Sequence, residues 1–492
     1  MTAQRFRFIS TIFISTLSVN ALALPIDWSG TFGVDSHTIS NSCRAEDSSN
    51  TPGSQGIDGK CNASFQTYIF KLNPQIIVND GVTLKGEFST GHMRGGFAGD
   101  NAASNENGPS NNAHFSSTPA QNSTLNVNQM YMELYADTAL VKIGRMSKHF
   151  GLGIVWDNGE DAWDRFFTMY DGIEAEMKIG NFSFTPYFAK ISSTKNDNPT
   201  NGPAGGAGSP NGEGDVKEMG LVAKYENKNR DLTVAVLYGK RKSEPYNTLY
   251  TRNSDPTTTD LDYQRTNVTI IEPYVSKRWN KFTVAAEASI QTGDYGKVYD
   301  ANTESKLSAN AYVLEASYEL NPKWNVGLTL GQVSGDKSGT NKFEATYLNP
   351  NYNIADLMFR YNYAAFTTAN RGGAFDASVA NAQFIRLSGD YKTDKWTWKM
   401  AAIMAKAMET AKNGDKSYHH EGNYSFTAAG DQDDDLGVEV DVGFDYRWNP
   451  NVTISGYYGY WKVGDYYGFS NTGDDLSVKS IHGGGLRATL DF

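Results

Sequence analysis

The chain has 492 residues and a formal net charge of −11, and it is rich in aromatic residues (13%) and in glycine (48 residues), although only 39% of it is hydrophobic. This composition argues against a disordered chain, which would be poor in aromatics, and the negative charge argues against nucleic acid as a partner. No run of about 20 apolar residues follows the N-terminus, which excludes a bundle of membrane-spanning helices.

The N-terminal segment has the pattern of a secretory signal peptide. Arg5 and Arg7 precede the apolar stretch 8–19, and Ala21-Leu22-Ala23 follows as a cleavage site. The apolar stretch is too short to cross a membrane, so we expect residues 1–23 to be removed and residues 24–492 to form one exported domain. The first strand is expected almost directly after the cleavage site, which leaves no length for an N-terminal plug.

The two cysteines of the chain, Cys43 and Cys61, lie in a polar segment after the first predicted strand. An oxidising compartment favours a disulfide between them, which would stabilise the fold by about 3 kcal/mol on the chain-entropy model. A metal site is the weaker interpretation, because no histidine or further cysteine lies nearby at ligand spacing.

Apolar and polar residues alternate along most of the remaining chain, which is the period of a strand with one apolar face. In the clearest segment, Leu436, Val438 and Val440 share one face, whereas Glu439 and Asp441 share the other. The pattern predicts 18 strands, with 16 as the alternative, over residues 26–40, 62–79, 82–93, 124–137, 139–147, 170–180, 182–193, 215–228, 231–242, 263–278, 280–294, 308–321, 323–336, 380–394, 395–409, 434–448, 451–466 and 479–492.

The connections between these strands alternate between long and short. The long ones include 94–123, 148–169 and 337–379, and the short ones include Asn79-Asp80-Gly81 and Asn449-Pro450. Outer-membrane barrels pair long external loops with tight periplasmic turns. We therefore predict an all-β fold, a transmembrane antiparallel up-and-down β-barrel with both ends in the periplasm, in the outer membrane of a Gram-negative bacterium.

Aromatic residues at the strand ends support this fold. Five tryptophans lie beside predicted periplasmic turns or ends and point with the apolar face of their strands, as in the aromatic girdle of a membrane barrel; they are Trp28, Trp279, Trp324, Trp396 and Trp448. The last strand alternates up to a C-terminal Phe492, which resembles the C-terminal signature of outer-membrane barrels.

One segment carries motifs of a known group. It contains Tyr131-Met132-Glu133-Leu134-Tyr135, then Val141-Lys142-Ile143-Gly144-Arg145, and later Asp171-Gly172-Ile173-Glu174. This resembles a unit of bacterial porins and of the alginate-export family, and the resemblance implies a monomeric 18-stranded barrel with a functional seventh outer loop, here around Phe343 to Pro350. An exporter of a polyanionic sugar needs a basic lumen, whereas the inward charges here are mixed and somewhat acidic. The resemblance therefore predicts architecture and not substrate.

The polar faces of the strands should line the lumen. The predicted pore-lining residues are Glu133, Lys142, Glu174, Glu176, Lys178, Glu218, Glu287, Glu315, Arg386, Glu439, Asp441, Asp445 and Arg447. They form either solvated ion pairs across neighbouring strands or a wet pore whose excess of carboxylates favours cations. Both interpretations can hold together.

The third long loop is unusually apolar for an exposed segment, with Phe150, Leu152, Ile154, Val155 and Trp156. It either folds into the barrel and narrows the pore or packs against its neighbours outside, and the sequence does not decide between these. In the first case the candidate constriction residues are Asp157, Asp161, Asp164 and Arg165.

No motif of a hydrolase, a metalloprotease or a P-loop occurs, so we expect no enzyme. No cofactor is expected, although Ca²⁺ could bind acidic runs such as Asp433 to Asp435 in the outer loops. The main functional prediction is a porin for passive diffusion of small hydrophilic solutes, favouring cations or neutral solutes. The alternatives are a substrate-specific saccharide or polymer channel and a structural surface barrel or adhesin. Outer-membrane lipid and lipopolysaccharide are the expected surroundings, and both a monomer and a homotrimer remain open.

Overall fold

The computed structural model describes residues 26–46, 62–90, 95–97, 125–192, 216–243, 266–300, 303–363, 366, 374–375, 377–421, 424–471 and 475–492. The predicted signal peptide and Cys61 lie outside these residues. Cys43 is disulfide-bonded, as the sequence led us to expect. Among the described residues, no helix is long and apolar enough to span a membrane.

The fold is a closed antiparallel barrel of 18 long strands. In chain order these strands are β1 (Ile26–Ser40), β3 (Asn62–Asn79), β4 (Val82–Thr90), β6 (Leu125–Tyr135), β7 (Ala139–Ser147), β8 (Met169–Ile179), β9 (Phe182–Ser192), β10 (Val216–Asn227), β11 (Leu232–Ser243), β12 (Asn267–Trp279), β13 (Phe282–Asp300), β14 (Thr303–Asn321), β15 (Trp324–Val333), β17 (Ala382–Lys392), β18 (Trp396–Ala407), β21 (Asp435–Arg447), β22 (Val452–Val463) and β24 (Ile481–Asp491).

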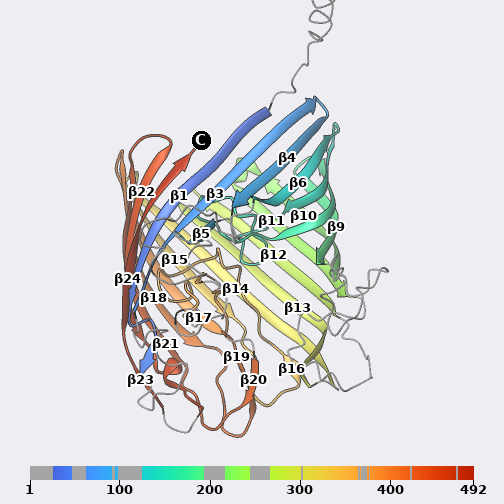
Figure 1. The fold of residues 1–492 in the computed structure, drawn as a ribbon. Helices are drawn as coiled ribbons and strands as arrows, with labels where there is room; N and C mark the ends of the chain where they lie inside the picture. Colours follow the sequence, from blue (N-terminus) through green and yellow to red (C-terminus); the bar gives the residue numbers. More distant parts are fainter. Residues whose placement is uncertain are drawn as a thin grey trace, which may run out of the picture.

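Each long strand pairs with its neighbours in the chain, and β1 pairs with β24 to close the ring. Within the described parts of the long loops there are six short strands: β2 (Ala45–Glu46), β5 (Gly95–Phe97), β16 (Lys342–Phe343), β19 (Lys416–His419), β20 (Tyr424–Thr427) and β23 (Ser477–Val478). Figure 1 shows β1 beside β24, with the C-terminus at the upper end of the barrel and β16, β19, β20 and β23 at the opposite end.

The strand pattern predicted from the sequence is confirmed, and the alternative of 16 strands is wrong. The largest difference concerns the sixth outer connection. The sequence predicted a loop at 295–307, but β13 and β14 continue to Asp300 and Thr303. The backbones of Asp300 and Thr303 pair in register, so the sheet continues past the last residues whose side chains alternate.

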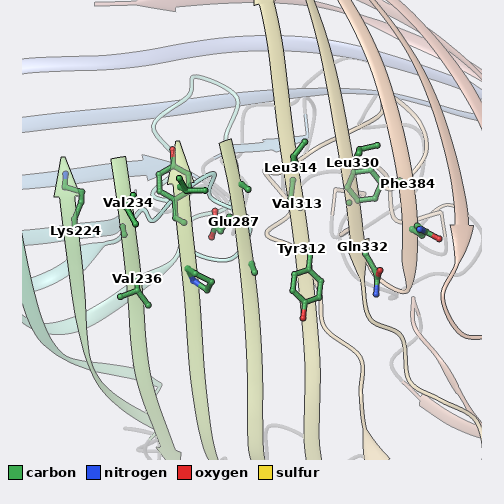
Figure 2. A pocket seen from close by; sticks show the side chains of 18 of the residues that line it. Lys224, Val234, Val236, Glu287, Tyr312, Val313, Leu314, Leu330, Gln332 and Phe384 are labelled. Atoms are coloured by element: carbon green, nitrogen blue, oxygen red, sulfur yellow. The ribbon is translucent and has the colours of Figure 1, made fainter. Parts of the chain in front are cut away.

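The two faces of the wall differ as predicted. On β21, Val438, Val440 and Val442 are exposed, whereas Glu439 and Asp441 between them are buried inside the barrel. The five girdle tryptophans are between 37% and 62% exposed on the outer face. Figure 2 shows this outer face on adjacent strands, with Val234, Val236, Tyr312 and Leu314 on it. The exterior is therefore an apolar band, as a surface in contact with lipid requires.

Candidate functional site

The third loop, residues 148–168 between β7 and β8, lies inside the barrel. The backbone N–H of Leu152 donates to Glu287 on β13 (2.5 Å), and the indole of Trp163 donates to Thr489 on β24 (2.8 Å). These strands lie far apart in the barrel order, so the loop crosses the lumen. The choice that the sequence left open is decided in favour of an inward loop.

Local geometry explains how this loop reaches the wall. Gly151 has a φ of +61°, and a Cβ atom there would collide with the Glu287 carboxylate. Glycine alone combines this backbone conformation with so close an approach. Phe150 and Trp156 are buried beside it, and the Phe150 N–H donates to the Trp156 carbonyl (3.0 Å).

The seventh loop runs from residue 334 to residue 381 between β15 and β17, and its described residues also fill part of the lumen. The backbone N–H groups of Leu357 and Met358 each donate to Glu439 on β21 (2.6 Å), and the N–H of Asp356 donates to Asp441 (3.1 Å). Two wall carboxylates therefore accept three consecutive backbone donors, which fixes the loop against the inner face.

A glycine notch in the wall receives the same turn of the seventh loop. Cβ atoms placed on Gly459 of β22 and Gly483 of β24 would lie 3.0 and 3.2 Å from carbons of Leu357. Leu357 is fully buried and belongs to a large apolar cluster that includes Val313, Ile403 and Trp461 of the inner wall. The barrel thus contains a packed interior next to β14–β24.

The two inward loops contact each other. The N–H of Asn349 donates to the Ile154 carbonyl (2.7 Å). The side-chain amide of Asn351 donates to Asp157 and to the Phe166 carbonyl, both at 2.7 Å. The third and seventh loops therefore form one narrowing element.

The candidate constriction acids lie on this element and are fixed by local bonds. Asp157 accepts from Asn351 (2.7 Å) and from the Gly159 N–H (2.8 Å). Asp164 accepts from the Asp161 N–H (2.9 Å), and the Asp161 carbonyl accepts from Lys71 on β3 (2.5 Å). The structure brings all three acids into the lumen.

Arg165, the fourth candidate, points to the wall formed by β1 and β3. Its guanidinium donates to Thr67 (2.5 Å), lies 3.7 Å from Asp35 and stacks on the ring of Phe375 (4.6 Å). Burial lowers the pKa of Arg165 to about 10, which still leaves the group charged at neutral pH.

The pKa values of two acids of the third loop are shifted in opposite directions. Burial alone would raise the pKa of Asp157, but hydrogen bonds from His149 and Asn351 hold that pKa below its ordinary value. Burial and the neighbouring Asp157 and Asp161 raise the pKa of Asp164 to about 6. Of Asp157 and Asp164, it is therefore Asp164 that changes charge nearer to neutral pH.

A basic and aromatic cluster next to Arg165 was not predicted as a site. Arg487 of β24 lies 3.7 Å from Asp35 and 4.9 Å from the Trp163 ring. Arg360 of the seventh loop binds Asp356 (2.8 Å) and stacks on Tyr457 (4.6 Å). The inward parity of Arg487 is readable from the sequence, whereas the position of Arg360 depends on a loop without periodicity.

The predicted pore-lining residues all lie on the inner parity of their strands, but their surroundings differ. Four carboxylates accept hydrogen bonds from the inward loops: Glu287, Glu315 (from Tyr352, 2.5 Å), Glu439 and Asp441. Others form ion pairs along the wall: Glu133 with Lys85 (3.0 Å), Lys142 with Glu174 (3.0 Å), Glu176 with Lys178 (3.3 Å), Glu218 with Arg241 (2.8 Å) and Asp445 with Lys399 (2.6 Å). Arg386 is half-buried, and Arg447 is exposed at the end with the short turns. Their role as pore lining stays a prediction.

The acidic runs of the outer loops have partners within the protein. The Asp433 carboxylate accepts from the Asp435 N–H (2.8 Å), and Asp434 lies 3.3 Å from Lys406. Among the described residues, no three His, Cys, Asp or Glu side chains group as a metal site requires.

Comparison with known proteins gives similar solved structures only; no family model and no curated protein matches the chain. A BenF-like porin from Pseudomonas fluorescens Pf-5 is 10% identical over 95% of this chain and 98% of that chain, with a TM-score of 0.49. OccK2 (OpdF) of Pseudomonas aeruginosa in complex with glucuronate is 12% identical over 95% and 96%, with a TM-score of 0.48. A loop L8 deletion mutant of OmpT, an outer membrane protein of Vibrio cholerae, is 11% identical over 96% and 100%, with a TM-score of 0.37. At this level the likeness carries no argument about function, and membership of the alginate-export family is not shown.

Proposed function

We propose that the protein is an outer-membrane porin for passive diffusion of small hydrophilic solutes, with a preference for cations or neutral solutes. The observation that carries this proposal is a closed barrel of 18 strands with an apolar exterior and a charged interior. Barrels of roughly 16–18 strands leave an aqueous channel. The narrow region where the third and seventh loops contact each other is then the place where solutes are selected by size.

Charge selection depends on two faces of this lumen. Glu272, Glu287 and Glu315 lie on one side, on the neighbouring strands β12, β13 and β14. The cluster of Arg165, Arg360 and Arg487 faces them from the third loop, the seventh loop and β24. Carboxylates along the wall favour cations, and the proposal is that they outweigh the arginines, several of which lie close to Asp35 or Asp356.

The test is conductance of the purified protein in a planar bilayer. We expect discrete steps and a reversal potential in a salt gradient that shows a permeability ratio of K⁺ to Cl⁻ at or above one. A barrel that shows no conductance but keeps its heat-modifiable migration on gels would support the surface-barrel alternative instead. A clear preference for Cl⁻ would overturn the proposed selectivity while leaving the channel.

Two substitutions test the role of the loops. Asp157→Ala removes an acceptor of Asn351 and so loosens the junction of the two loops, which should raise single-channel conductance. Arg165→Ala removes a cation from the narrow region and should raise the ratio of K⁺ to Cl⁻. Glu176→Gln is the control, since its pair with Lys178 lies away from both loops. An unchanged conductance in Asp157→Ala together with an unchanged ratio of K⁺ to Cl⁻ in Arg165→Ala would contradict a constriction here.

A second candidate is a channel specific for one saccharide or polymer. Two observations favour it: two loops fill part of the lumen, and the half-buried Tyr457 lies there between Arg360 and His37. A specific channel would show concentration-dependent block of its conductance by the sugar, whereas a general porin would show none. In either case we propose a transport role without catalysis.

A further inference from the structure

A row of lysines crosses the outer face of the barrel at its long-loop end. Lys190 on β9 pairs in register with Lys217 on β10, and Lys217 pairs with Lys242 on β11. Lys240 lies one pleat below and donates to Thr269 (3.0 Å). All four share the outward parity of exposed apolar residues on the same strands, so they face away from the lumen.

The charged residues on either side of this lysine row form ion pairs, whereas the lysines at its centre stand next to each other. On one side Asp171 stands opposite Lys190 and forms a bidentate pair with Arg145 (2.8 and 3.1 Å). On the other side the row continues through Asn267 to Asp294 and Lys306, which are paired with each other.

Lysines in register repel each other, because residues directly opposite in a sheet have Cβ atoms about 5 Å apart. Lys217 has a lysine on both sides, and in the described part of this row the acids stand next to Lys190 or two strands from Lys242. An anion that is shared between the ammonium groups would turn this repulsion into attraction.

An apolar surface begins directly below the lysine row. Phe188, Met219, Leu221 and Tyr238 are exposed on β9, β10 and β11. Further down, the outer face is hollowed into a groove of about 1090 Å³, whose lining includes Val236, Pro273, Ala286 and Tyr312; Figure 2 shows Val236 and Tyr312 there. A row of cationic side chains above an apolar surface is complementary to an amphiphile with an anionic head group and apolar chains.

We propose that the lysine row binds the phosphate groups of a phosphorylated, acylated glycolipid of the outer leaflet, of the lipopolysaccharide class. The ammonium groups of Lys217 and Lys242 contact the phosphates, and the acyl chains lie along Met219, Tyr238 and the groove below. A second copy of the chain is the poorer occupant, because a two-fold contact at this face would set two lysine rows against each other. The inference uses the membrane placement of the barrel and does not require conduction.

The experiment measures binding of defined lipids to the full-length barrel in detergent, by native mass spectrometry. The probes are bisphosphorylated lipid A, the same lipid without phosphates, phosphatidylethanolamine and inorganic phosphate. The test variant is Lys217→Ala/Lys242→Ala. A second variant, Lys217→Arg/Lys242→Arg, keeps the charges, and Lys323→Ala/Lys395→Ala removes two lysines from the opposite end of the barrel.

We expect the wild type, the arginine variant and the opposite-end control to bind bisphosphorylated lipid A, and the alanine variant to bind it at least about tenfold more weakly, with the gap narrowing at high salt. Equal binding by the wild type and the alanine variant would overturn the proposal. So would equal binding of the lipid without phosphates, or binding of inorganic phosphate as tight as that of the lipid.

Two further measurements distinguish a failure of the lipid site from misfolding and from a failure of the proposed channel function. Heat-modifiable gel migration shows that each variant is folded. Single-channel conductance should be the same in the alanine variant and the wild type, because the lysines lie outside the lumen. A silent barrel that still binds the lipid would therefore refute the porin and leave this site. Loss of a dimer in the lipid-free alanine variant would instead assign the row to contact between copies.

Discussion

At the scale of single residues, carboxylates of the inner wall bind backbone N–H groups of the inward loops. Glu287 binds the third loop and Glu439 binds the seventh. Alternation predicted that both side chains point inward, since parity needs only the local sequence. It gave no sign of their partners, because Leu152 and Leu357 lie in loops far away in the chain.

Replacing Glu439 should release the seventh loop. In Glu439→Gln an NH₂ group replaces one of the two carboxylate oxygens, so the side chain can no longer accept from the N–H groups of both Leu357 and Met358. Hydrogen bonds to charged groups contribute about 1.5–3 kcal/mol each, so we expect higher single-channel conductance and a lower midpoint of thermal unfolding. Glu176→Gln should leave both unchanged, and equal values for the two variants would refute the role of Glu439.

Asp164 should make the channel sensitive to pH. Its pKa is about 6 in the folded protein and its ordinary value is 3.8, so the folded chain holds this proton more tightly than the unfolded chain. Through this group alone, the free energy of unfolding falls as pH rises from about 4 to about 6. Cation conductance should rise over the same range as the carboxylate ionises. Asp164→Asn should flatten that step; a step that persists in this variant belongs to another group.

At the scale of elements, strands were predictable and inward loops were not. The 18 strands carry their alternation locally, and even the tryptophan girdle follows from parity. The seventh loop has no period, and its buried residues, such as Leu357 and Tyr361, are apolar because of contacts with distant strands. The third loop gave a partial signal through its apolar composition, which indicated burial but not the side of the wall.

The glycine notch offers a test of loop packing against the wall. Gly459→Ala would place a Cβ atom 2.8 Å from the Asp441 carboxylate and 3.0 Å from Leu357, which should displace the seventh loop and raise conductance. Gly389→Ala on β17 is the matched control, because its nearest neighbour would lie at 3.6 Å. If both variants conduct like the wild type, the notch does not hold the loop.

At the scale of the whole molecule, closure of the barrel depends on β24. This strand pairs with β1 on one side and β22 on the other, and the backbones of Gly30 and Phe492 exchange two hydrogen bonds (2.8 and 3.0 Å). Without these pairs, β1 and β22 would both become open edges, which a lipid environment does not tolerate.

A proline in β24 should prevent closure. Ala488 pairs with Val34 and Ile454 on its two sides, so Ala488→Pro removes a ladder donor between them. We expect loss of the heat-modifiable band on gels. Ala488→Val keeps the donor on a lipid-facing position and should retain the band; a proline variant that still shows it would mean that closure does not rest on this pairing.

The apolar cluster that the seventh loop forms with β14–β24 gives these strands two apolar faces, one toward lipid and one toward the loop. The cluster also includes Ile39 of β1, so its inner wall is complete only once β1 has paired with β24. We therefore expect the seventh loop to dock after the ring has closed. Release of the loop would leave the strand pairs of the wall in place, so we expect permeability to change while the barrel stays closed.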